Sequence, residues 1–499
     1  MEIQVTSGSI TEQSTDTYVV TFEERGSISG ELAAVDGALS GAITRLHRDE
    51  VLVGKNGEVH ALGRSGRVRA ARTVIAGVGR GPQLTLDRLR NNIGTLARRL
   101  RDMNAGKVLI STEGLTSRLP AEDVGRTIAE GLVLGLYRFD KHHTKAADRP
   151  SGSVESVALV EPRTRRGAQL RRGVATGTIL GEAGNLARDL ENEPANHMTP
   201  TDVASHALEL ADDVGLECTV IERAEAERLG MGSYLSVAAG SVQPPTFIVL
   251  RYRGAGRARP LALIGKGITF DSGGISLKPG AGMEAMKADM SGAATVIGAM
   301  RAIGRLQPRV NVLAIAPCTE NMPGGSATKP GDVVYAMDGQ SIEVINTDAE
   351  GRLILADALA YANTLGLTPL IDVATLTGAC SVALGDVATG VMTNDDSLAE
   401  EVIAAGKRGG EKLWQLPMYE EYEEQIKSNV ADVKNTGGRM AGAQTAAKLL
   451  AMFVDDTPWA HLDMAGTDDA SKTNGILVKG ATGVPVRTLV NFVRTRAEA

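Results

Sequence analysis

The sequence predicts an α/β fold with two α/β domains, a smaller N-terminal domain and a larger C-terminal domain with a mostly parallel central sheet. A chain of 499 residues is too long for one ordinary domain. Apolar strand patterns alternate with helical patterns along most of it, which is typical of layered α/β domains. The C-terminal strands are almost continuously apolar, as strands buried on both faces must be.

The N-terminal third supplies the elements of the smaller domain. Its apolar runs predict strands, and its longer amphipathic runs predict helices. The expected strands are Tyr18–Glu23, Arg72–Gly77, Lys107–Ser111 and Val154–Val160, and the expected helices are Leu84–Met103 and Ala121–Phe139. A polar, basic stretch, Glu161–Arg172, then interrupts the pattern and is our candidate boundary. We therefore expect domains at residues 1–165 and 166–499.

The rest of the chain supplies the larger domain. A helix is expected over Gly173–Leu190, and another from Thr201 with Asp202 beside it as a cap. The strongest strands and the helices between them predict a central parallel sheet covered on both faces. These strands are Thr246–Tyr252, Pro260–Lys266, Asn311–Ala316 and Leu370–Ala374, and these helices are Ser291–Leu306 and Ala349–Thr364.

Composition restricts the environment in which the chain works. The hydrophobic fraction of 43% with 58 glycines indicates a compact globular protein. Three distant cysteines, Cys218, Cys318 and Cys380, argue against a disulfide framework and are interpreted as buried small hydrophobes. The N-terminus lacks the pattern of a secretory signal, and no stretch approaches 18 apolar residues. We expect a cytoplasmic protein that does not associate with membranes.

Three segments place ionisable residues among glycines at the expected carboxyl ends of buried strands, where ligands bind in open α/β sheets. They are Ile264–Lys278, Lys287–Met290 and Asn346–Leu353. If the carboxylates of these segments converge, they would repel one another and take up protons unless cations balance them. Two divalent cations would do so, and such a pair turns a shared water into hydroxide near neutral pH. The four carboxylates are Asp271, Asp289, Asp348 and Glu350.

The ligand types limit the choice of metal without deciding it. Histidine does not occur between His206 and His461, so a histidine-based zinc site is excluded from these segments. An oxygen-rich site with at most one nitrogen donor suits manganese, magnesium, cobalt or carboxylate-bound zinc. Lys266 could contribute that nitrogen only as a neutral amine beside a dication. Taken singly, Asp289 and Asp348 are more often helix caps or turn formers than metal ligands, and Glu350 could be a first-turn helix charge.

Read together, the three segments resemble the signature of the cytosolic leucine aminopeptidase family, which includes the bacterial enzyme called aminopeptidase A. The octapeptide Asn346–Leu353 matches the hallmark of that family letter for letter. The resemblance covers roughly residues 175–490 and extends through Asn192–Thr199, Pro323–Val333, the loop at Thr375–Ala379, Ala431–Ala447 and Trp459–Gly466. It implies a metal-dependent aminopeptidase that removes N-terminal residues, preferentially leucine-like, from peptides by means of a metal-bridging hydroxide.

The resemblance also implies a role for each matched residue. Lys266 and Asp289 would serve the tightly held metal, Asp348 the exchangeable one, and Asp271 and Glu350 would bridge both. The two basic residues Lys278 and Arg352 would act in catalysis. Lys278 would stabilise the oxyanion, and Arg352 would hold a bicarbonate ion that acts as the general base.

Further expectations follow from the same resemblance. The substrate pocket is expected around Met283, Met286, Thr375 and Ala465, whose apolar character suits a leucine-like side chain. The resemblance also implies a homohexamer with its active sites turned toward an inner cavity. The metals expected first are manganese or zinc, two per subunit, with magnesium or cobalt as alternatives.

Two other functions compete with this interpretation. Carboxylate-bound metal pairs also serve phosphoesterases, although a phosphate substrate should require more basic side chains than Lys278 and Arg352. The net charge of −7 combines a slightly basic front with an acidic remainder. Arginines at 64, 67, 69 and 72, with the Glu161–Arg172 stretch, therefore allow an additional DNA-binding or regulatory role. We do not favour it, because exposed charge runs are usually solvated surface.

Overall fold

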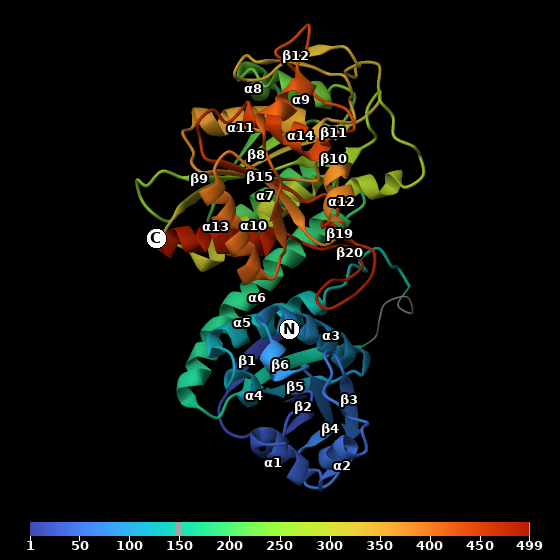
Figure 1. Ribbon diagram of the computed structural model, residues 1–499, viewed down its shortest axis with the longest axis vertical. Coiled ribbons are helices and arrows are strands. Elements are labelled where there is room, and N and C mark those ends of the chain that lie inside the picture. The colour runs from blue at the N-terminus through green and yellow to red at the C-terminus, as the bar shows by residue number, and fades with distance from the viewer. Residues whose placement is uncertain (146–151, 499) are drawn as a thin grey trace. The chain divides into compact units, whose positions relative to one another are not determined.

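The computed structural model describes residues 1–145 and 152–498 and divides into two compact units (Figure 1). The first unit comprises Met1–Glu182 together with Lys472–Val478. The second comprises Ala183–Ser471 together with Lys479–Ala499. Each unit has its own central sheet, so the expectation of two α/β domains is confirmed.

The sheet of the first unit is largely parallel, as expected. Its strands lie in the order β1-β6-β5-β2-β4-β3. Neighbouring strands are parallel throughout the described part of this sheet except at its edge, where β3 runs antiparallel to β4. The strands are β1 (Glu2–Thr6), β2 (Thr15–Phe22), β3 (Val59–Gly63), β4 (Ala70–Gly77), β5 (Gly106–Ser111) and β6 (Val154–Val160).

Helices cover both faces of this sheet. On one face, α3 and α5 pack through buried aliphatic side chains such as Leu89, Ile93 and Leu132. On the other face, α1 and α2 cover a second cluster that contains Tyr18 and Ile43. The helices of the unit are η1 (Ile10–Glu12), α1 (Gly30–Ala38), α2 (Ala42–Arg48), η2 (Gly81–Gln83), α3 (Leu86–Asp102), α4 (Glu113–Thr116) and α5 (Ala121–Gly135), followed by α6 (Thr164–Asn192).

Helix α6 corrects our interpretation of the basic stretch at Glu161–Arg172. The stretch is not a linker, because the helix begins at Thr164 and continues without interruption to Asn192. The two compact units separate inside this helix, after Glu182. Arginine is a good helix former, and glycines at 173 and 177 lie against the backbone of α5, so the helix packs closely despite its polar sequence. The expected helix Gly173–Leu190 is therefore the later part of a longer one.

The larger sheet of the second unit has a parallel centre. Its strands lie in the order β16-β15-β18-β14-β9-β11-β8-β7, and β10 pairs with the far end of β11. Strands β18, β14, β9 and β11 are mutually parallel. The strands are β7 (Glu217–Glu222), β8 (Thr246–Arg253), β9 (Leu261–Gly265), β10 (Gly267–Asp271), β11 (Asn311–Asn321), β14 (Leu370–Ala374), β15 (Thr389–Thr393), β16 (Leu413–Gln415) and β18 (Trp459–Asp463).

Strand β11 is longer than the sequence predicts. We expected it to end at Ala316, but it continues to Asn321 because its last residues pair with β10. Smaller sheets lie outside this central one: β12 (Val333–Tyr335) pairs with β13 (Ser341–Glu343), which pairs with β17 (Val433–Lys434), and β19 (Asp469–Ala470) pairs with β20 (Gly480–Ala481).

The helices that the sequence predicts in the second unit are found to within a few residues, and the structure adds others that the sequence did not predict. Helix α10 has the expected bounds, and α11 begins two residues later than expected. Helix α7 begins at Pro200, because Thr199 is its N-cap and Asp202 completes the capping box. The helices are α7 (Pro200–Val214), α8 (Arg223–Arg228), α9 (Gly232–Ala238), η4 (Met283–Met290), α10 (Ser291–Leu306), α11 (Gly351–Thr364), α12 (Gly378–Leu384), α13 (Asp396–Gly409), η5 (Glu420–Ile426), α14 (Gly442–Ala451) and α15 (Val486–Glu498).

Two further expectations concern single residues and the membrane. Cys318 and Cys380 are buried as expected, whereas Cys218 is only half-buried, and all three are free thiols. Among the residues that the structure describes, none of the helices combines the length and the apolar character that crossing a bilayer requires.

Candidate active site

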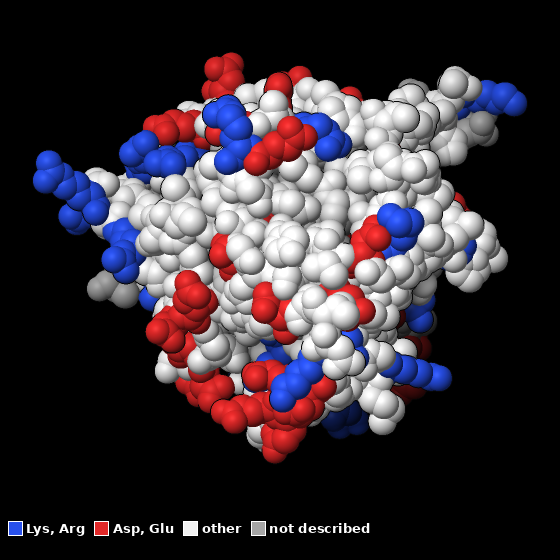
Figure 2. Space-filling view, turned by 90° about the horizontal axis from the view of Figure 1, so that it is seen from above, with Lys and Arg blue, Asp and Glu red and all other residues white. Residues whose placement is uncertain are grey.

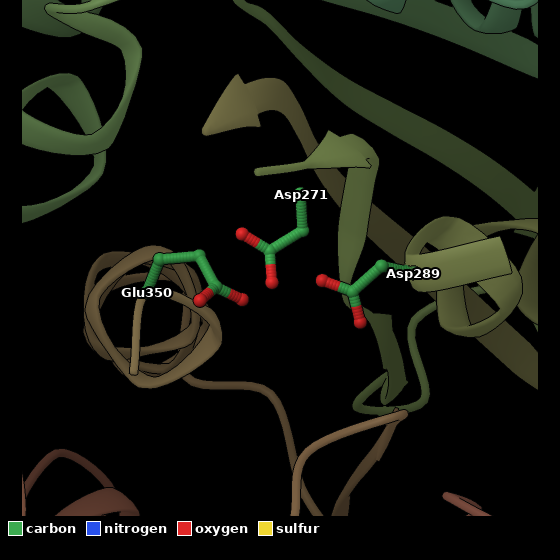
Figure 3. A group of neighbouring side chains, drawn as sticks. All are labelled: Asp271, Asp289 and Glu350. Carbon is green, nitrogen blue, oxygen red and sulfur yellow. The ribbon is translucent and has the colours of Figure 1, made fainter. Parts of the chain in front are cut away.

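Three carboxylates from different elements converge at the carboxyl edge of the larger sheet. Asp271 is the last residue of β10, Asp289 lies in η4 just before α10, and Glu350 immediately precedes α11. One oxygen of each lies within 4.8 Å of the others. Figure 3 shows the three side chains turned toward one another. Residues that are far apart in the sequence thus form one acidic cluster.

Lys266 lies inside this cluster. It directly follows β9, and its Nζ lies 2.8 Å from Asp289 Oδ1 and 2.8 Å from Glu350 Oε1. It also donates a hydrogen bond of 3.0 Å to the carbonyl oxygen of Thr375. Its side chain is only 3% exposed. Burial by itself would lower the pKa of Lys266, but the carboxylates around it outweigh burial and raise the pKa above that of an ordinary lysine.

Lys278 holds the other side of the cluster together. Its Nζ lies 2.8 Å from Asp271 Oδ2 and 2.6 Å from Asp348 Oδ1. Burial opposes the charge of Lys278, but Asp271 and Asp348 raise its pKa above the usual value. The four carboxylates that we expected to converge therefore do so, and two lysines compensate part of their charge. This corrects the sequence interpretation, which left them without any protein counter-charge.

The remaining negative charge makes the cluster suitable for cations. Four carboxylates face two ammonium groups, and Asp289 Oδ2 and Glu350 Oε2 are buried without a hydrogen-bond partner in the described part of the chain. Burial raises the pKa of Asp289 well above its usual range, and the nearby carboxylates raise it further while Lys266 opposes them. Such uncompensated oxygens suit hard divalent cations, which prefer oxygen ligands. The residues present therefore fit the expected metals.

Several residues that hold the cluster were not singled out from the sequence as parts of it. Asn321, at the end of β11, donates a hydrogen bond of 2.8 Å to Asp271 Oδ1. Thr375, which we expected only in the substrate pocket, donates one of 2.8 Å to Asp289 Oδ1. Asn435 accepts a hydrogen bond of 2.6 Å from Arg352 Nη1 through its main-chain oxygen. Thr375 and Asn435 lie in segments that the family resemblance covers, but only the fold shows which groups these residues contact.

Arg352 lies in the first turn of α11 and is buried. Burial lowers its pKa to about 10, although Glu350 and Asp463 oppose this shift. Its Nε is buried without a hydrogen-bond partner among the described residues. The side chain thus borders the cavity with hydrogen-bonding capacity left over.

A cavity of about 1100 Å³ opens onto the cluster. Lys266, Lys278 and all four carboxylates line it, together with Arg352. Of the four residues expected around the substrate, Met286, Thr375 and Ala465 line the cavity, whereas Met283 does not. The cavity is large enough for a small peptide and presents its charged groups at one place.

An acidic cluster that lines a cavity at the carboxyl edge of an α/β sheet fits the class of metal-dependent hydrolases. Sequence profiles identify the family. The catalytic domain of the cytosol aminopeptidase family matches residues 185–490, and the N-terminal domain of the same family matches residues 19–146. The chain belongs to the cytosol aminopeptidase family, and it is a metal-dependent aminopeptidase, a hydrolase that acts on peptides.

Individual relatives agree with this assignment. The chain is 43% identical over 497 residues to a protein of Alkaliphilus metalliredigens (strain QYMF) named "Probable cytosol aminopeptidase", with 99% of each chain covered. It is 47% identical over 467 residues to a protein of the same name from Geobacter sulfurreducens, with 93% of each covered.

Two solved structures share the whole fold. A mutant of tomato leucine aminopeptidase aligns with a TM-score of 0.88 at 35% identity, covering 99% of this chain and 96% of its own. The bottromycin maturation enzyme BotP in complex with Mn aligns with a TM-score of 0.85 at 34% identity, covering 97% of this chain and 100% of its own. The family and the fold class expected from the sequence are therefore confirmed.

Proposed function

We propose that this aminopeptidase removes leucine-like N-terminal residues from peptides and that it binds two divalent cations per subunit to do so. One observation carries the proposal: the carboxylates and Lys266 meet in a single cluster that lines the cavity. The residues that would hold the cations are Lys266, Asp271, Asp289, Asp348 and Glu350. When bound, the cations would make a bridging water acidic enough to supply hydroxide near neutral pH.

The protein residues have separate tasks in this proposal. Lys278 would donate a hydrogen bond to the substrate carbonyl oxygen and stabilise the negative charge that develops there. This requires Lys278 to release one of its two carboxylate partners, and its 22% exposure leaves room for that movement. Asp289 would accept a hydrogen bond from the free α-amine of the substrate, which restricts cleavage to the N-terminus. Arg352 would hold the bicarbonate ion that serves as general base.

The properties of similar proteins support the finer details. One solved structure contains Mn, and another is named leucine aminopeptidase, so we propose manganese as the first metal to test and leucine as the preferred residue. Zinc, magnesium and cobalt are the alternatives. We also propose a cytoplasmic homohexamer, because the relatives carry the name cytosol aminopeptidase and the family resemblance implies that assembly.

The experiment that tests this proposal compares two substrates on one preparation. Leucyl-para-nitroanilide and para-nitrophenyl phosphate are assayed before chelation, after chelation and after Mn²⁺ is restored. We expect hydrolysis of the leucyl substrate alone, its loss on chelation and its recovery with Mn²⁺. Turnover of only the phosphate ester, or full leucyl activity in the chelated protein, would contradict the proposal.

An additional nucleic-acid role stays a prediction of the sequence. Arg172 of the basic stretch pairs with Glu122 at 2.8 Å, so part of its charge is already compensated. Figure 2 shows a face on which acidic side chains gather at the lower edge and basic ones are scattered among them. Retardation of duplex DNA that weakens steeply with salt would support the role, and no retardation at low salt would exclude it.

A further inference from the structure

The loop that carries the two carboxylates Asp348 and Glu350 has no regular secondary structure. It connects β13 to α11 and runs from residue 344 to residue 350. The position of a side chain on such a loop depends on how firmly the loop backbone is held. The question is therefore which contacts hold this backbone in position.

Asn435 supplies four of these contacts from outside the loop. It follows β17, which is parallel to β13, and its backbone N–H continues that ladder by donating 2.9 Å to the carbonyl oxygen of Glu343. Its side chain is 0% exposed. It thus lies beside the strand that leads into the loop, where its amide can reach the loop backbone.

The side-chain amide of Asn435 uses its full hydrogen-bonding capacity on the loop. Its Oδ1 accepts hydrogen bonds from the backbone N–H of Ile345 at 2.8 Å and of Asn346 at 3.2 Å. Its Nδ2 donates to the carbonyl oxygen of Asn346 at 2.6 Å and, more weakly, to that of Ala349 at 3.4 Å. A primary amide offers two donors and two acceptor positions, so all four are engaged.

The pattern of these bonds fixes the orientation of the amide. Rotating it by half a turn would set its NH₂ against two N–H donors and its oxygen against two carbonyl oxygens. No other side chain of this size has both an acceptor and a double donor in that arrangement. Aspartate in particular would turn two attractive contacts into repulsive ones.

Asn435 also connects the loop to Arg352. Its main-chain oxygen accepts the hydrogen bond of 2.6 Å from Arg352 Nη1. Asn435 therefore contacts the loop backbone on both sides of Asp348, and one of these contacts is to Ala349, which directly precedes Glu350. It also contacts Arg352 in the first turn of α11. The positions of the loop carboxylates and of Arg352 therefore depend on the same residue, Asn435.

We infer that Asn435 is a positioning residue for the cation site: its amide holds the loop so that Asp348 and Glu350 face the cavity at the spacing the cations require. This inference rests on the proposed function. Hydrogen-bond partners of metal ligands typically affect metal affinity or activity by about 10- to 100-fold when they are replaced. An anchor that holds two carboxylates should lie within that range.

The test replaces Asn435 by aspartate in the full-length protein and uses Asn311 as a matched control. Asn311 is also buried and begins β11, and its amide makes the same kind of contacts. It accepts from Ala255 N at 2.9 Å and donates to the carbonyl oxygens of Gly256 at 3.1 Å and Ala258 at 2.7 Å. These contacts lie outside the cavity lining. N311D therefore reproduces the structural cost of the change without touching the loop.

Four quantities are measured on the wild type and on both variants. Free Mn²⁺ is followed by electron paramagnetic resonance while chelator-stripped protein is titrated, kcat and KM are determined for leucyl-para-nitroanilide, and the unfolding midpoint is recorded. We expect N435D to weaken Mn²⁺ binding and to lower kcat by about 10- to 100-fold each, with a smaller change in KM. N311D should lower the unfolding midpoint to a similar extent and leave Mn²⁺ affinity and kcat at wild-type values.

The outcomes separate this inference from the proposed function. Wild-type Mn²⁺ affinity and kcat in N435D would overturn the role of Asn435 while the proposed function stands. A wild type that binds Mn²⁺ but does not cleave the leucyl substrate would contradict the proposed function, and the Mn²⁺ titration would still decide the role of Asn435. A wild type that binds no Mn²⁺ would overturn both. Should N435D not fold, Asn435→Ser, which shortens the side chain out of reach of the loop, is judged by the same criterion.

Discussion

The two lysines of the active site have the same kind of partners in different surroundings. Lys266 and Lys278 each lie between two carboxylates at 2.6–2.8 Å. Lys266 is 3% exposed, whereas Lys278 is 22% exposed and its partner Asp348 is 34% exposed. Water can replace the contact of Lys278 with Asp348 but not the contacts of Lys266. The cluster thus has a sealed half and an open half, and the open half is the one that can rearrange around a substrate.

The largest effect is expected from Glu350→Gln in the sealed half. Glutamine keeps the shape of the side chain but removes the negative charge that pairs with Lys266 and that would bind the cations. We expect leucyl-peptidase activity to fall to background with the fold retained, as measured by the leucyl-para-nitroanilide assay and circular dichroism. Glu423→Gln, which breaks an exposed ion pair with Lys448, is the control and should remain active. A near-normal rate in Glu350→Gln would show that Glu350 holds no cation.

The second prediction compares the lysines through stability. In chelated protein, Lys266→Met leaves Asp289 and Glu350 buried without their cationic partner. We expect a loss of about 3–5 kcal/mol in the free energy of unfolding, the usual result of removing one partner of a buried ion pair. Lys278→Met should cost clearly less, because one of its two partners, Asp348, is 34% exposed and can be hydrated. Equal losses, measured by urea unfolding in the presence of chelator, would remove the distinction between the two halves.

The third prediction concerns turnover in the open half. Lys278→Ala removes the group that we assign to the carbonyl oxygen of the substrate. We expect kcat to fall by about 10²- to 10³-fold, the size of effect that removing one oxyanion donor produces. Metal content, measured by elemental analysis, should stay that of the wild type. Loss of metal in this variant would instead move Lys278 into the ligand set.

The smallest effect is expected from Asp357, a buried carboxylate that has no lysine partner and serves as a reference for the carboxylates of the cluster. Asp357 on α11 accepts hydrogen bonds of 2.7 Å from the backbone N–H groups of Tyr234 and Met337. Burial raises its pKa from 3.8 to about 7 in spite of these bonds. Because the folded-state pKa is the higher one, its contribution to stability is complete below pH 3.8 and is lost as the pH rises through about 7.

We therefore expect the free energy of unfolding of the wild type to decrease between pH 3.8 and about 7 more steeply than that of Asp357→Asn, which does not titrate. Urea unfolding at a series of pH values measures both slopes. Parallel curves would mean that Asp357 does not take up a proton on folding. Asp357 could then not serve as the example of a buried carboxylate without a lysine partner against which the carboxylates paired with Lys266 and Lys278 are compared.

Sequence and structure agree best where local patterns are strong. Helix α10 and strand β14 have the predicted bounds, because each is a mostly apolar segment with clear ends. The prediction for the basic stretch Glu161–Arg172 was wrong: most of it forms the first turns of α6, and its arginines resemble a linker only when their packing partner is unknown. Strand β11 was cut short for a similar reason: its last residues belong to the sheet only because β10 pairs with them. The predicted bounds of a helix or strand are wrong where a packing or pairing partner far away in the sequence determines where the element begins or ends.

By itself, the sequence determined the two α/β domains, the family and the carboxylates that meet in the cluster, because periodicity and an unbroken motif are properties of neighbouring residues. Only the tertiary structure decided which half of the cluster is sealed, that two lysines share its charge, and that Asn321 and Asn435 hold the segments that carry the carboxylates. Burial and hydrogen-bond partnership depend on residues that lie far away along the chain. They arise only when the strands of the sheet bring those residues to one edge.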